Sequence, residues 1–359
     1  MTRRALITGI SGQDGAYLSR FLIGKGYQVI GARRYSASGG LWRLEELGIL
    51  DKVEMISIDL LEFSNIVSVI EKVRPHEIYN LAAQSFVGAS FEQPLYTADV
   101  GAMGVTRVLE AVRMIDPSIR LYQASTSEMF GMVREMPQSE RTPFYPRSPY
   151  AVAKLYAHWM MVNYRESYGM HASCGILFNH ESPLRGEEFV TRKITRGLAR
   201  VRHGLSDAIE LGNLDAARDW GFAGDYVEAM WAMVQRERPD DFVIATGRNA
   251  TIREFVELTG AAAGFDIEWR GEGEAATGID RNTGRTIVRV NPRFYRPAEV
   301  DLLLGNATKA REILGWTPKV RLEELTHMMV AADMERVERQ AAARTDGSST
   351  WTGAARAAN

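Results

Sequence analysis

Near its N-terminus the chain reads Ala5-Leu6-Ile7-Thr8-Gly9-Ile10-Ser11-Gly12-Gln13-Asp14-Gly15. A short apolar strand, Ala5–Ile7, runs into three glycines spaced three apart, and a helical stretch follows at Ala16–Gly24. Glycines let the backbone turn tightly and approach a pyrophosphate, which the N–H groups and dipole at a helix start then bind. The order of strand, glycines and helix predicts a dinucleotide-binding turn, whereas the glycines alone would fit any strand-to-helix turn.

Beyond this turn, short apolar runs continue to alternate with amphipathic stretches. The runs that we interpret as strands are Gln28–Ala32, Val53–Ile58, Glu77–Leu81 and Arg120–Ala124. Short, continuously apolar strands suit a parallel sheet with helices on both faces, and right-handed crossovers then give a doubly wound sheet. We therefore predict an α/β fold whose first domain occupies residues 1–178.

The rest of the chain predicts a smaller, mixed α/β domain at residues 179–335. A helix at Asp225–Val234 followed by a strand at Asp241–Ala245 predicts a return to the first sheet at about residues 215–245. The segment 340–359 lacks apolar periodicity, and we expect it to be disordered. Two further helical stretches are predicted at Thr191–His203 and Ile252–Ala263, and a hairpin-like stretch is predicted at Gly271–Val290.

Composition excludes several classes of protein. With 359 residues, 45% of them hydrophobic, the chain can bury a large core, so general disorder is excluded. Lysines and arginines number 43 against 45 acidic residues, without a basic stripe, so we expect no nucleic-acid partner. The single cysteine, Cys174, excludes an intrachain disulfide, and the six histidines lack metal-ligand spacing, so we expect no metal. No run approaches the roughly 18 apolar residues that span a bilayer, and no signal-like segment is evident, so we expect a cytoplasmic protein without membrane contact.

The residues after the second strand bear on the choice of cofactor. In dinucleotide folds a carboxylate roughly 20 residues after the glycines binds the 2′-hydroxyl of NAD, and an arginine there accommodates the 2′-phosphate of NADP. This chain has Arg33 and Arg34 at that place and no carboxylate, which favours NADP; the alternative is a pair of solvated arginines. Asp59 and Leu60 fall where an adenine would lie, although Asp59 could instead cap a helix.

Two short segments carry candidate catalytic residues. Tyr150 and Lys154 are one helical turn apart, and a neighbouring ammonium favours the phenolate that lets a tyrosine act as a base. Such pairs also occur by chance on surface helices. Thr126 and Glu128 follow the strand Arg120–Ala124, and in an extended backbone both side chains would point to one face. Alternatively, Thr126 or Ser127 caps a helix whose first turn contains Glu128.

These motifs together give the chain a resemblance to the extended short-chain dehydrogenase/reductases. The motifs are Gly9–Gly15, Asn80–Ser85, Ser125–Glu128 and Tyr150-x-x-x-Lys154. Four later segments are similar to the GDP-mannose 4,6-dehydratase family within that group, namely Leu177–Pro183, Phe189–Ile194, Arg218–Gly221 and Arg296–Val300. The resemblance runs from about Ala5 to Ala332 and implies a Rossmann-like fold that binds NADP and GDP-mannose.

The resemblance also implies a reaction, the redox-neutral dehydration of GDP-D-mannose to GDP-4-dehydro-6-deoxy-D-mannose. Tyr150, assisted by Lys154 and Thr126, would take the proton of the 4-hydroxyl while hydride leaves C4 for the cofactor. Glu128 would remove the C5 proton and help to expel the 6-hydroxyl as water. Hydride would then return to C6, and Tyr150 would supply a proton at C5 or C6.

Two other classes of function remain as alternatives. A one-step 4-epimerase or 4-keto reductase needs no carboxylate beside the tyrosine, so Glu128 favours the dehydratase over both. A non-catalytic NADP-binding regulator would not need Thr126, Tyr150 and Lys154 together.

Carried over by position, the resemblance implies two sets of ligand-binding residues. Those for NADP are Gly9, Gly12, Gln13, Asp14, Gly15, Arg33, Arg34, Asp59, Leu60, Leu81, Ala82, Ala83, Gln84, Ser85, Tyr96, Lys154, His180 and Arg185. Those for the sugar nucleotide are Ser85, Thr126, Glu128, Tyr150, Asn179, Val190, Lys193, Arg218, Arg296 and Glu299. On the residues alone, Arg218 and Arg296 could form surface ion pairs with Asp219 and Glu299, and His180 could be structural.

The resemblance leaves two oligomeric states open. The loop Tyr35–Gly40 departs from the Arg-Ser-Ser type run of tetrameric members of the family, in which this loop reaches a neighbouring subunit's cofactor site. A homodimer through packed helices, as in most extended relatives, is therefore favoured over a homotetramer.

Overall fold

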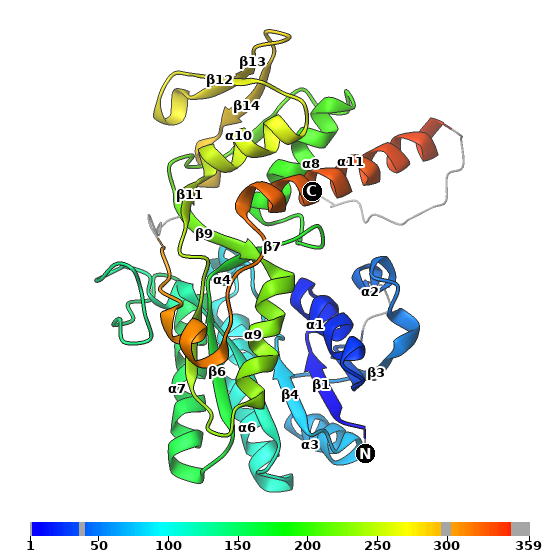
Figure 1. Ribbon diagram of the computed structural model, residues 1–359, viewed down its shortest axis with the longest axis vertical. Helices are drawn as coiled ribbons and strands as arrows, with labels where there is room; N and C mark the ends of the chain where they lie inside the picture. The colour runs from blue at the N-terminus through cyan, green and yellow to red at the C-terminus, as the bar shows by residue number, and fades with distance from the viewer. Residues whose placement is uncertain (1, 36–39, 296–302, 346–359) are drawn as a thin grey trace.

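The centre of the molecule is a seven-stranded parallel sheet (Figure 1). The computed structural model describes residues 2–35, 40–295 and 303–345, so Arg296 and Glu299 lie outside the described residues. The strand order is β10-β6-β5-β4-β1-β2-β3. From β1 the chain adds β2 and β3 on one side and then β4, β5, β6 and β10 on the other, which confirms the doubly wound α/β fold. The strands are β1 Arg4–Thr8, β2 Gln28–Arg33, β3 Val53–Ser57, β4 Glu77–Asn80, β5 Arg120–Thr126, β6 Ala172–Leu177 and β10 Asp241–Ile244.

Helices cover both faces of this sheet. The long helices of the two layers are α1 Gln13–Gly24 and α9 Ala223–Gln235 on one face, and α3 Phe63–Val73, α6 Gly104–Ile115 and α7 Pro149–Tyr168 on the other. Successive strand residues point to opposite faces, so Ile7 joins the α1–α9 core and Leu6 joins the core under α3, α6 and α7. All six residues of β6 are buried, which explains why this strand lacks polar alternation.

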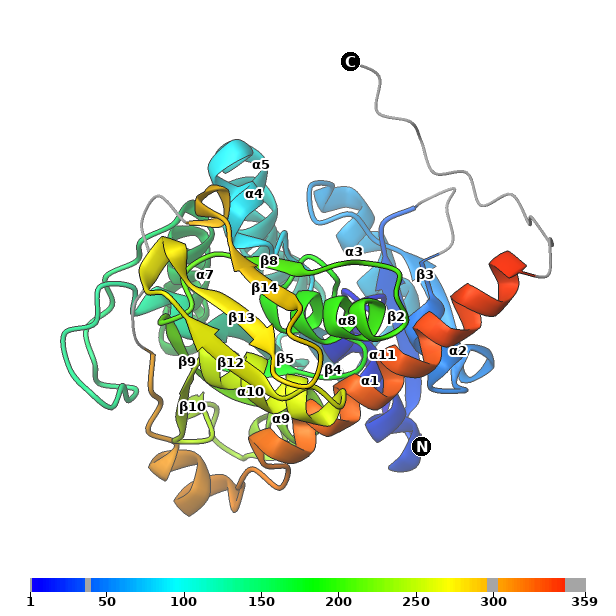
Figure 2. The same cartoon turned by 90° about the horizontal axis from the view of Figure 1, so that it is seen from above.

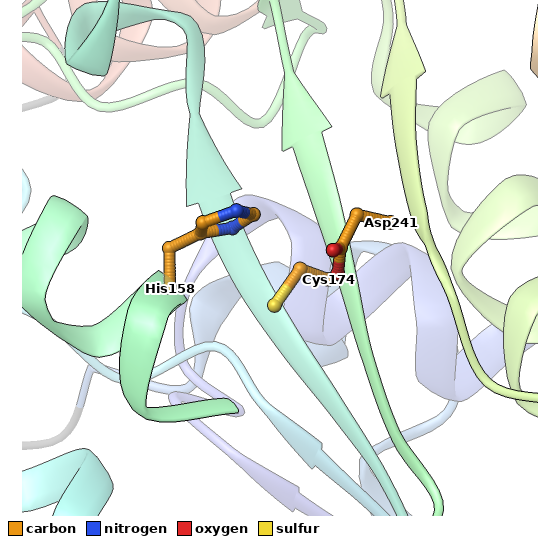
Figure 3. Close-up of side chains that lie close together, drawn as sticks. All are labelled: His158, Cys174 and Asp241. Carbon is orange, nitrogen blue, oxygen red and sulfur yellow. The ribbon is translucent and has the colours of Figure 1, made fainter. Parts of the chain in front are cut away.

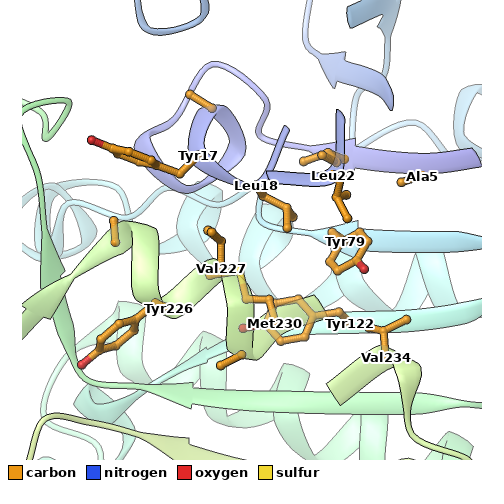
Figure 4. Packing of buried hydrophobic residues seen from close by; sticks show 14 of the residues in the cluster. Ala5, Tyr17, Leu18, Leu22, Tyr79, Tyr122, Tyr226, Val227, Met230 and Val234 are labelled. Carbon is orange, nitrogen blue, oxygen red and sulfur yellow. The ribbon is translucent and has the colours of Figure 1, made fainter. Parts of the chain in front are cut away.

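Two helices from distant parts of the chain share one core (Figure 4). Leu18 and Leu22 of α1 and Met230 of α9 pack with Tyr79 and Tyr122 of the sheet. Helix α9 therefore completes a layer that α1 begins.

Shorter helical segments connect these elements. They are α2 Trp42–Glu46, α4 Val87–Glu92, α5 Pro94–Ala98 and the single turns η1 Leu50–Lys52, η2 Asp99–Met103, η3 Ser127–Met129, η4 Gly273–Ala275, η5 Pro292–Phe294 and η6 Ala310–Leu314.

A second, smaller part lies beyond the carboxyl ends of the sheet strands (Figures 1 and 2). Its helices α8, α10 and α11 share one apolar core with two small sheets, ordered β11-β9-β7 and β12-β13-β14-β8. The elements are β7 Asn179–Glu181, α8 Val190–Arg202, β8 Ile209–Leu211, β9 Ala217–Phe222, β11 Asn249–Thr251, α10 Ile252–Ala262, β12 Ile267–Arg270, β13 Thr277–Asp280, β14 Thr286–Val290 and α11 Leu322–Thr345. The hairpin-like stretch predicted at Gly271–Val290 contains the β13–β14 pair, and β12 adds a strand that begins before it.

The chain crosses between the two parts more than once. In the segment 215–245, α9 and β10 return to the first sheet, where β10 pairs with β6, while β9 pairs with β7 and β11 instead. The chain returns to the first sheet a second time, after the second gap in the described residues. The sequence analysis did not predict this return. Leu303 packs with Phe178, and Trp316 packs against Tyr226 of α9.

Helix α11 requires a correction to the expected tail. It continues to Thr345, so the first residues of the segment predicted to be disordered, Gln340–Thr345, are helical, and the rest lies outside the described residues. Arg339 pairs with Glu335 one turn earlier, and Gln340 contacts Arg196 of α8. The three alanines that follow have high helix propensity, which periodicity alone does not register.

Within the described part of the chain, every helix is too short or too polar to serve as a membrane span.

Candidate active site

A cavity of about 670 Å³ lies where the carboxyl ends of the sheet strands face the smaller part of the molecule. Most of the predicted site residues line it, and they are Gly9, Gly12, Gln13, Asp14, Gly15, Leu81, Ala83, Ser85, Thr126, Glu128, Tyr150, Lys154, Asn179, His180, Arg185, Val190, Lys193 and Arg218. The predicted residues that stand outside its wall are Arg33, Arg34, Asp59, Leu60, Ala82, Gln84 and Tyr96.

The glycine turn forms one end of the cavity. Its backbone packs so closely against neighbouring backbone atoms that side chains at these positions would clash. Gly9 has a φ of +71°, and a Cβ there would lie 2.9 Å from the amide nitrogen of Ala82. A Cβ on Gly15 would lie 2.6 Å from the carbonyl oxygen of Gly9. The Thr8 hydroxyl donates to Asn80 Oδ1 at 2.7 Å and accepts from the backbone amides of Leu81 and Ala82, both at 3.1 Å. These hydrogen bonds hold the end of β4 against the glycine turn. The start of α1 therefore faces the cavity with its backbone N–H groups.

Helix α7 presents the predicted Tyr–Lys pair. Ser148 caps its start by accepting from the amide of Ala151 at 3.1 Å, and Pro149 takes the first helical position. The Lys154 ammonium is 4% exposed and donates to the Ala124 carbonyl at 2.7 Å. Its nitrogen lies 5.8 Å from the centre of the Tyr150 ring. The pair therefore faces the cavity and is not a chance surface pair.

Burial moves the pKa values of the pair in opposite directions. Desolvation raises the pKa of the Tyr150 hydroxyl to about 12, although a hydrogen bond from Thr126 lowers it in part. Desolvation lowers the pKa of the Lys154 ammonium to about 8. Burial therefore disfavours the charged form of both groups, although a pKa of about 8 leaves the Lys154 ammonium mostly protonated at pH 7.

Thr126 and Glu128 combine the two arrangements that the sequence left open. Thr126 is the last residue of β5, and its hydroxyl caps the following turn by accepting from the amide of Glu128 at 3.2 Å. Glu128 lies in that turn, 8% exposed, so the backbone is not extended between them. Both side chains still line the cavity, beside Tyr150.

His180 and Asp14 join the two parts of the molecule. The His180 Nε2 lies 2.8 Å from the Asp14 carboxylate, and its Nδ1 lies 2.8 Å from the Phe178 carbonyl oxygen. Its ring stacks on Tyr226 at 4.7 Å. Burial by itself would lower the pKa of His180, but the charge and hydrogen bond of Asp14 outweigh it and the pKa is raised. The same pairing outweighs burial at Asp14 and lowers its pKa.

The cationic residues of the smaller part also line the cavity. Arg218 is 7% exposed on β9, so it is not a surface residue, and the adjacent Asp219 carboxylate accepts from Thr246 and Gly247. The Lys193 ammonium lies 3.3 Å from the centre of the Phe294 ring. Three basic side chains on the cavity wall, those of Lys193, Arg218 and Arg185, can bind an anionic ligand.

The predicted cofactor-selecting residues stand at the ends of β2 and β3. Arg33 is the last residue of β2, and the Arg34 guanidinium lies 5.8 Å from the centre of the Tyr96 ring. Asp59 accepts from the amide of Leu61 at 3.0 Å and so holds a turn, while Glu62 precedes helix α3, so Asp59 is not that helix's cap.

Several cavity residues were absent from the sequence analysis. They are aromatic or polar side chains of the smaller part, namely Phe189, Asn213, Trp220, Arg293 and Phe294. Phe189 and Trp220 lie inside motifs that carried the family resemblance, and Arg293 and Phe294 lie three and two residues before Arg296, so closeness in the sequence was the available signal. Asn213 had none.

Comparison with known proteins identifies close relatives along nearly the whole chain. A family model described as GDP-mannose 4,6 dehydratase matches residues 6–329. The chain is 52% identical over 363 residues to the GDP-mannose 4,6-dehydratase of Yersinia enterocolitica, covering 96% of this chain and 97% of that protein. It is 51% identical over 339 residues to the human GDP-mannose 4,6 dehydratase, covering 92% of this chain and 91% of that protein.

Solved structures agree on the fold. A dTDP-glucose 4,6-dehydratase from Streptomyces venezuelae, solved with NAD bound, superposes with a TM-score of 0.79 at 19% identity. The superposition covers 94% of this chain and 98% of that one.

The His180–Asp14 pair makes a predictable contribution to stability. A histidine whose folded pKa is raised contributes stability that is complete below its unfolded pKa and is lost as the pH rises through the folded value. An aspartate whose folded pKa is lowered contributes stability above its unfolded pKa, which is lost as the pH falls through the folded value. We expect Asp14→Asn, which keeps the shape of the side chain, to cost about 1 kcal/mol near pH 5.5 and much less near pH 9.

Urea unfolding at the two pH values measures this difference. The matched control is Asp51→Asn, an exposed carboxylate in η1. A cost for Asp14→Asn that does not change between the two pH values would contradict the expectation.

Proposed function

This chain belongs to the GDP-mannose 4,6-dehydratase family, and from that membership we propose that its cavity removes water from GDP-D-mannose. The product is GDP-4-dehydro-6-deoxy-D-mannose. One observation carries the proposal. The Glu128 carboxylate lines the same wall as the Tyr150 hydroxyl and the Lys154 ammonium. A one-step epimerase or reductase needs only the last two groups.

The residues present fit a nicotinamide dinucleotide. The glycine turn leaves no room for a Cβ at Gly9 or Gly15, so the backbone N–H groups of α1 are accessible to a pyrophosphate. On the substrate side of the cavity, Asn179 Oδ1 is buried without a hydrogen-bond partner among the described residues, as expected of a group whose partner is the sugar nucleotide. When bound, the cofactor accepts hydride from C4 of the sugar and returns it to C6.

The chain's own residues handle the protons. Tyr150 accepts the proton of the 4-hydroxyl, Thr126 holds the phenol by a hydrogen bond, and Lys154 favours the phenolate by its charge. Oxidation at C4 acidifies the C5 proton, which the Glu128 carboxylate removes. Glu128 then delivers a proton to the departing 6-hydroxyl, which leaves as water. Tyr150 returns its proton to the sugar at C5, the carbon that lost a proton in the elimination. The protein groups therefore end in their starting protonation states.

The basic residues of the smaller part bind the diphosphate. Lys193 and Arg218 reach the cavity from α8 and β9, whereas Arg185, in the segment between β7 and α8, belongs to the proposed NADP site. Val190 and Asn179 contact the nucleotide side of the substrate. Arg296 and Glu299, for which the sequence suggests diphosphate and hydroxyl contacts, lie outside the described residues.

The cofactor is NADP by the same proposal. Support comes from Arg33 and Arg34 at the carboxyl end of β2, where an NAD-dependent site would place a carboxylate. The Tyr96 ring lies beside the Arg34 guanidinium, and Asp59 and Leu60 follow the neighbouring strand β3. These residues stand outside the cavity wall.

The outward face of α7 supports a homodimer. Val152, Tyr156 and Trp159 are 54%, 39% and 55% exposed, and they lie on the side of α7 opposite Tyr150 and Lys154. Met103 of η2 adds an exposed apolar side chain from an element in contact with α7. An apolar stripe on a long helix suits association with the same stripe of a second copy about a twofold axis.

Replacement of Tyr150 and Glu128 separates oxidation from elimination. Tyr150→Phe should lower turnover of GDP-mannose about 10²–10⁴-fold, because the general base is lost. Glu128→Gln should stall after the first hydride transfer, so that the reduced cofactor accumulates, which its absorbance reports. Mass spectrometry of the sugar nucleotide measures the loss of water.

Two exposed residues of α7 provide matched controls, Tyr168→Phe and Glu166→Gln. Full activity of Tyr150→Phe would remove Tyr150 from the mechanism. Wild-type rate without reduced cofactor in Glu128→Gln would leave Glu128 as a residue of the turn only.

Replacement of the arginine pair tests the cofactor. A charge-assisted hydrogen bond to a phosphate contributes about 1.5–3 kcal/mol, so Arg33→Ala with Arg34→Ala should weaken NADP binding by tenfold or more and leave NAD binding nearly unchanged. Calorimetric titration with each dinucleotide measures both. Equal weakening for the two dinucleotides would contradict NADP selection by these residues.

Replacement of Trp159 tests the assembly. Trp159→Glu places a charge in the centre of the proposed dimer contact, so sedimentation should change from two copies to one. Ile313→Glu, in η6, which contacts α9 and β10, is the control because Ile313 is 40% exposed, and this variant should stay a dimer. A wild-type chain that sediments as a monomer would refute the homodimer.

A further inference from the structure

A cluster of three side chains, two of them buried, has no role in the mechanism above (Figure 3). His158 of α7, Cys174 of β6 and Asp241 of β10 bring their polar side-chain atoms within 4.8 Å of one another. These are metal-ligating residue types. However, the Arg165 guanidinium donates to both Asp241 oxygens, at 2.9 and 2.7 Å, and burial raises the pKa of the Cys174 thiol well above its ordinary value. A metal ion would have to displace Arg165 and deprotonate the thiol, so the cluster suggests a different role.

The cluster continues the catalytic face of α7. Tyr150, Lys154 and His158 are spaced four apart, so they lie along one side of the helix. Each contacts one of the last residues of β5. The Tyr150 hydroxyl bonds to Thr126, the Lys154 ammonium bonds to the Ala124 carbonyl at 2.7 Å, and His158 Nδ1 lies 3.2 Å from the Ser125 hydroxyl.

Ser125 stands between the two catalytic contacts. Its neighbour Ala124 holds Lys154, and its other neighbour, Thr126, holds both the Tyr150 hydroxyl and the amide of Glu128. A shift of Ser125 would therefore move the partners of all three proposed catalytic groups. Its hydroxyl is 4% exposed and is directed to His158 and the Cys174 thiol.

The surroundings of His158 hold its ring in place and keep it neutral. It is 4% exposed and packs against the edge of Phe144 at 5.4 Å. Burial lowers its pKa, Asp241 opposes that shift, and Arg165 reinforces it. A neutral imidazole offers one donor and one acceptor, which suits a hydroxyl on one side and the Cys174–Asp241 side of the cluster on the other.

We propose that His158 is a positioning residue, which holds the end of β5 through Ser125. Lys154, Thr126 and Glu128 are thereby kept in the correct positions relative to the reacting sugar. The inference rests on the proposed dehydratase function. It predicts a loss in turnover without a loss in affinity for the nucleotide end of the substrate, which binds to other elements.

Two substitutions of His158 separate positioning from space filling. An asparagine amide reaches the place of Nδ1, which contacts Ser125, whereas a glutamine amide reaches that of Nε2, which does not. We expect His158→Asn to keep kcat within about twofold and His158→Gln to lower it about 5- to 10-fold, with KM for GDP-mannose unchanged in both. A residue that only fills space predicts the reverse order, because glutamine is closer to histidine in size.

Ser125→Ala provides a second test that does not depend on how the core tolerates changes at His158. Its matched control is Ser173→Ala, a fully buried serine on β6 whose hydroxyl has no hydrogen-bond partner among the described residues. Ser125→Ala should lower kcat as His158→Gln does, and the double variant should be no slower than either single one. Ser173→Ala should have wild-type turnover.

The outcomes distinguish this inference from the proposed function. A wild-type chain that does not dehydrate GDP-mannose refutes the function itself. With an active wild type, equal kcat for His158→Asn and His158→Gln, or for Ser125→Ala and Ser173→Ala, overturns the positioning role. Additive losses in the double variant overturn it as well, because Ser125 would then act without His158.

Discussion

The structure depends on the burial of one sheet face by two helices, α1 and α9, that the chain supplies far apart. Leu18 and Leu22 of α1 cover only part of that face, and Met230 and Val234 of α9 cover the rest. Because α9 follows β7 and α8, the chain must leave the sheet, build part of the smaller domain and then return. The return fixes the smaller part over the carboxyl ends of the strands, and the cavity lies between the two.

The chemistry of that cavity is organised by a second contact, between α7 and the end of β5. Ser148 caps the start of α7, and the spacing of four residues brings one side chain per helical turn to the last three residues of β5. The short turn after β5 then aims Glu128 at the same place. One helix and one strand end therefore supply the three groups that the proposed dehydration needs together, namely a base, an activating cation and a carboxylate.

Burial of these groups has an electrostatic consequence. Desolvation raises the pKa of Tyr150 to about 12 and lowers that of Lys154 to about 8, so each opposes the charged form that catalysis uses. The proximity of the two groups to each other and the bound ligands must offset this free-energy cost. The reaction therefore depends on ligands occupying the site. The His180–Asp14 pair, in contrast, gains enough from its own charges to overcome burial, and it ties the glycine turn to β7.

Local pattern determined much of this protein. The glycine turn, the continuously apolar strands and the spacing of Tyr150 and Lys154 predicted the sheet, its two layers and the face of α7, because these depend on neighbours within a few residues. Local pattern could not show that Thr126 both caps a turn and lines the cavity, that Trp316 returns to α9, or that α11 continues to Thr345. It also did not show Phe294 beside Lys193 or Ser125 against His158. These contacts join residues far apart in the chain, and only the packing of complete elements decides which side chains meet.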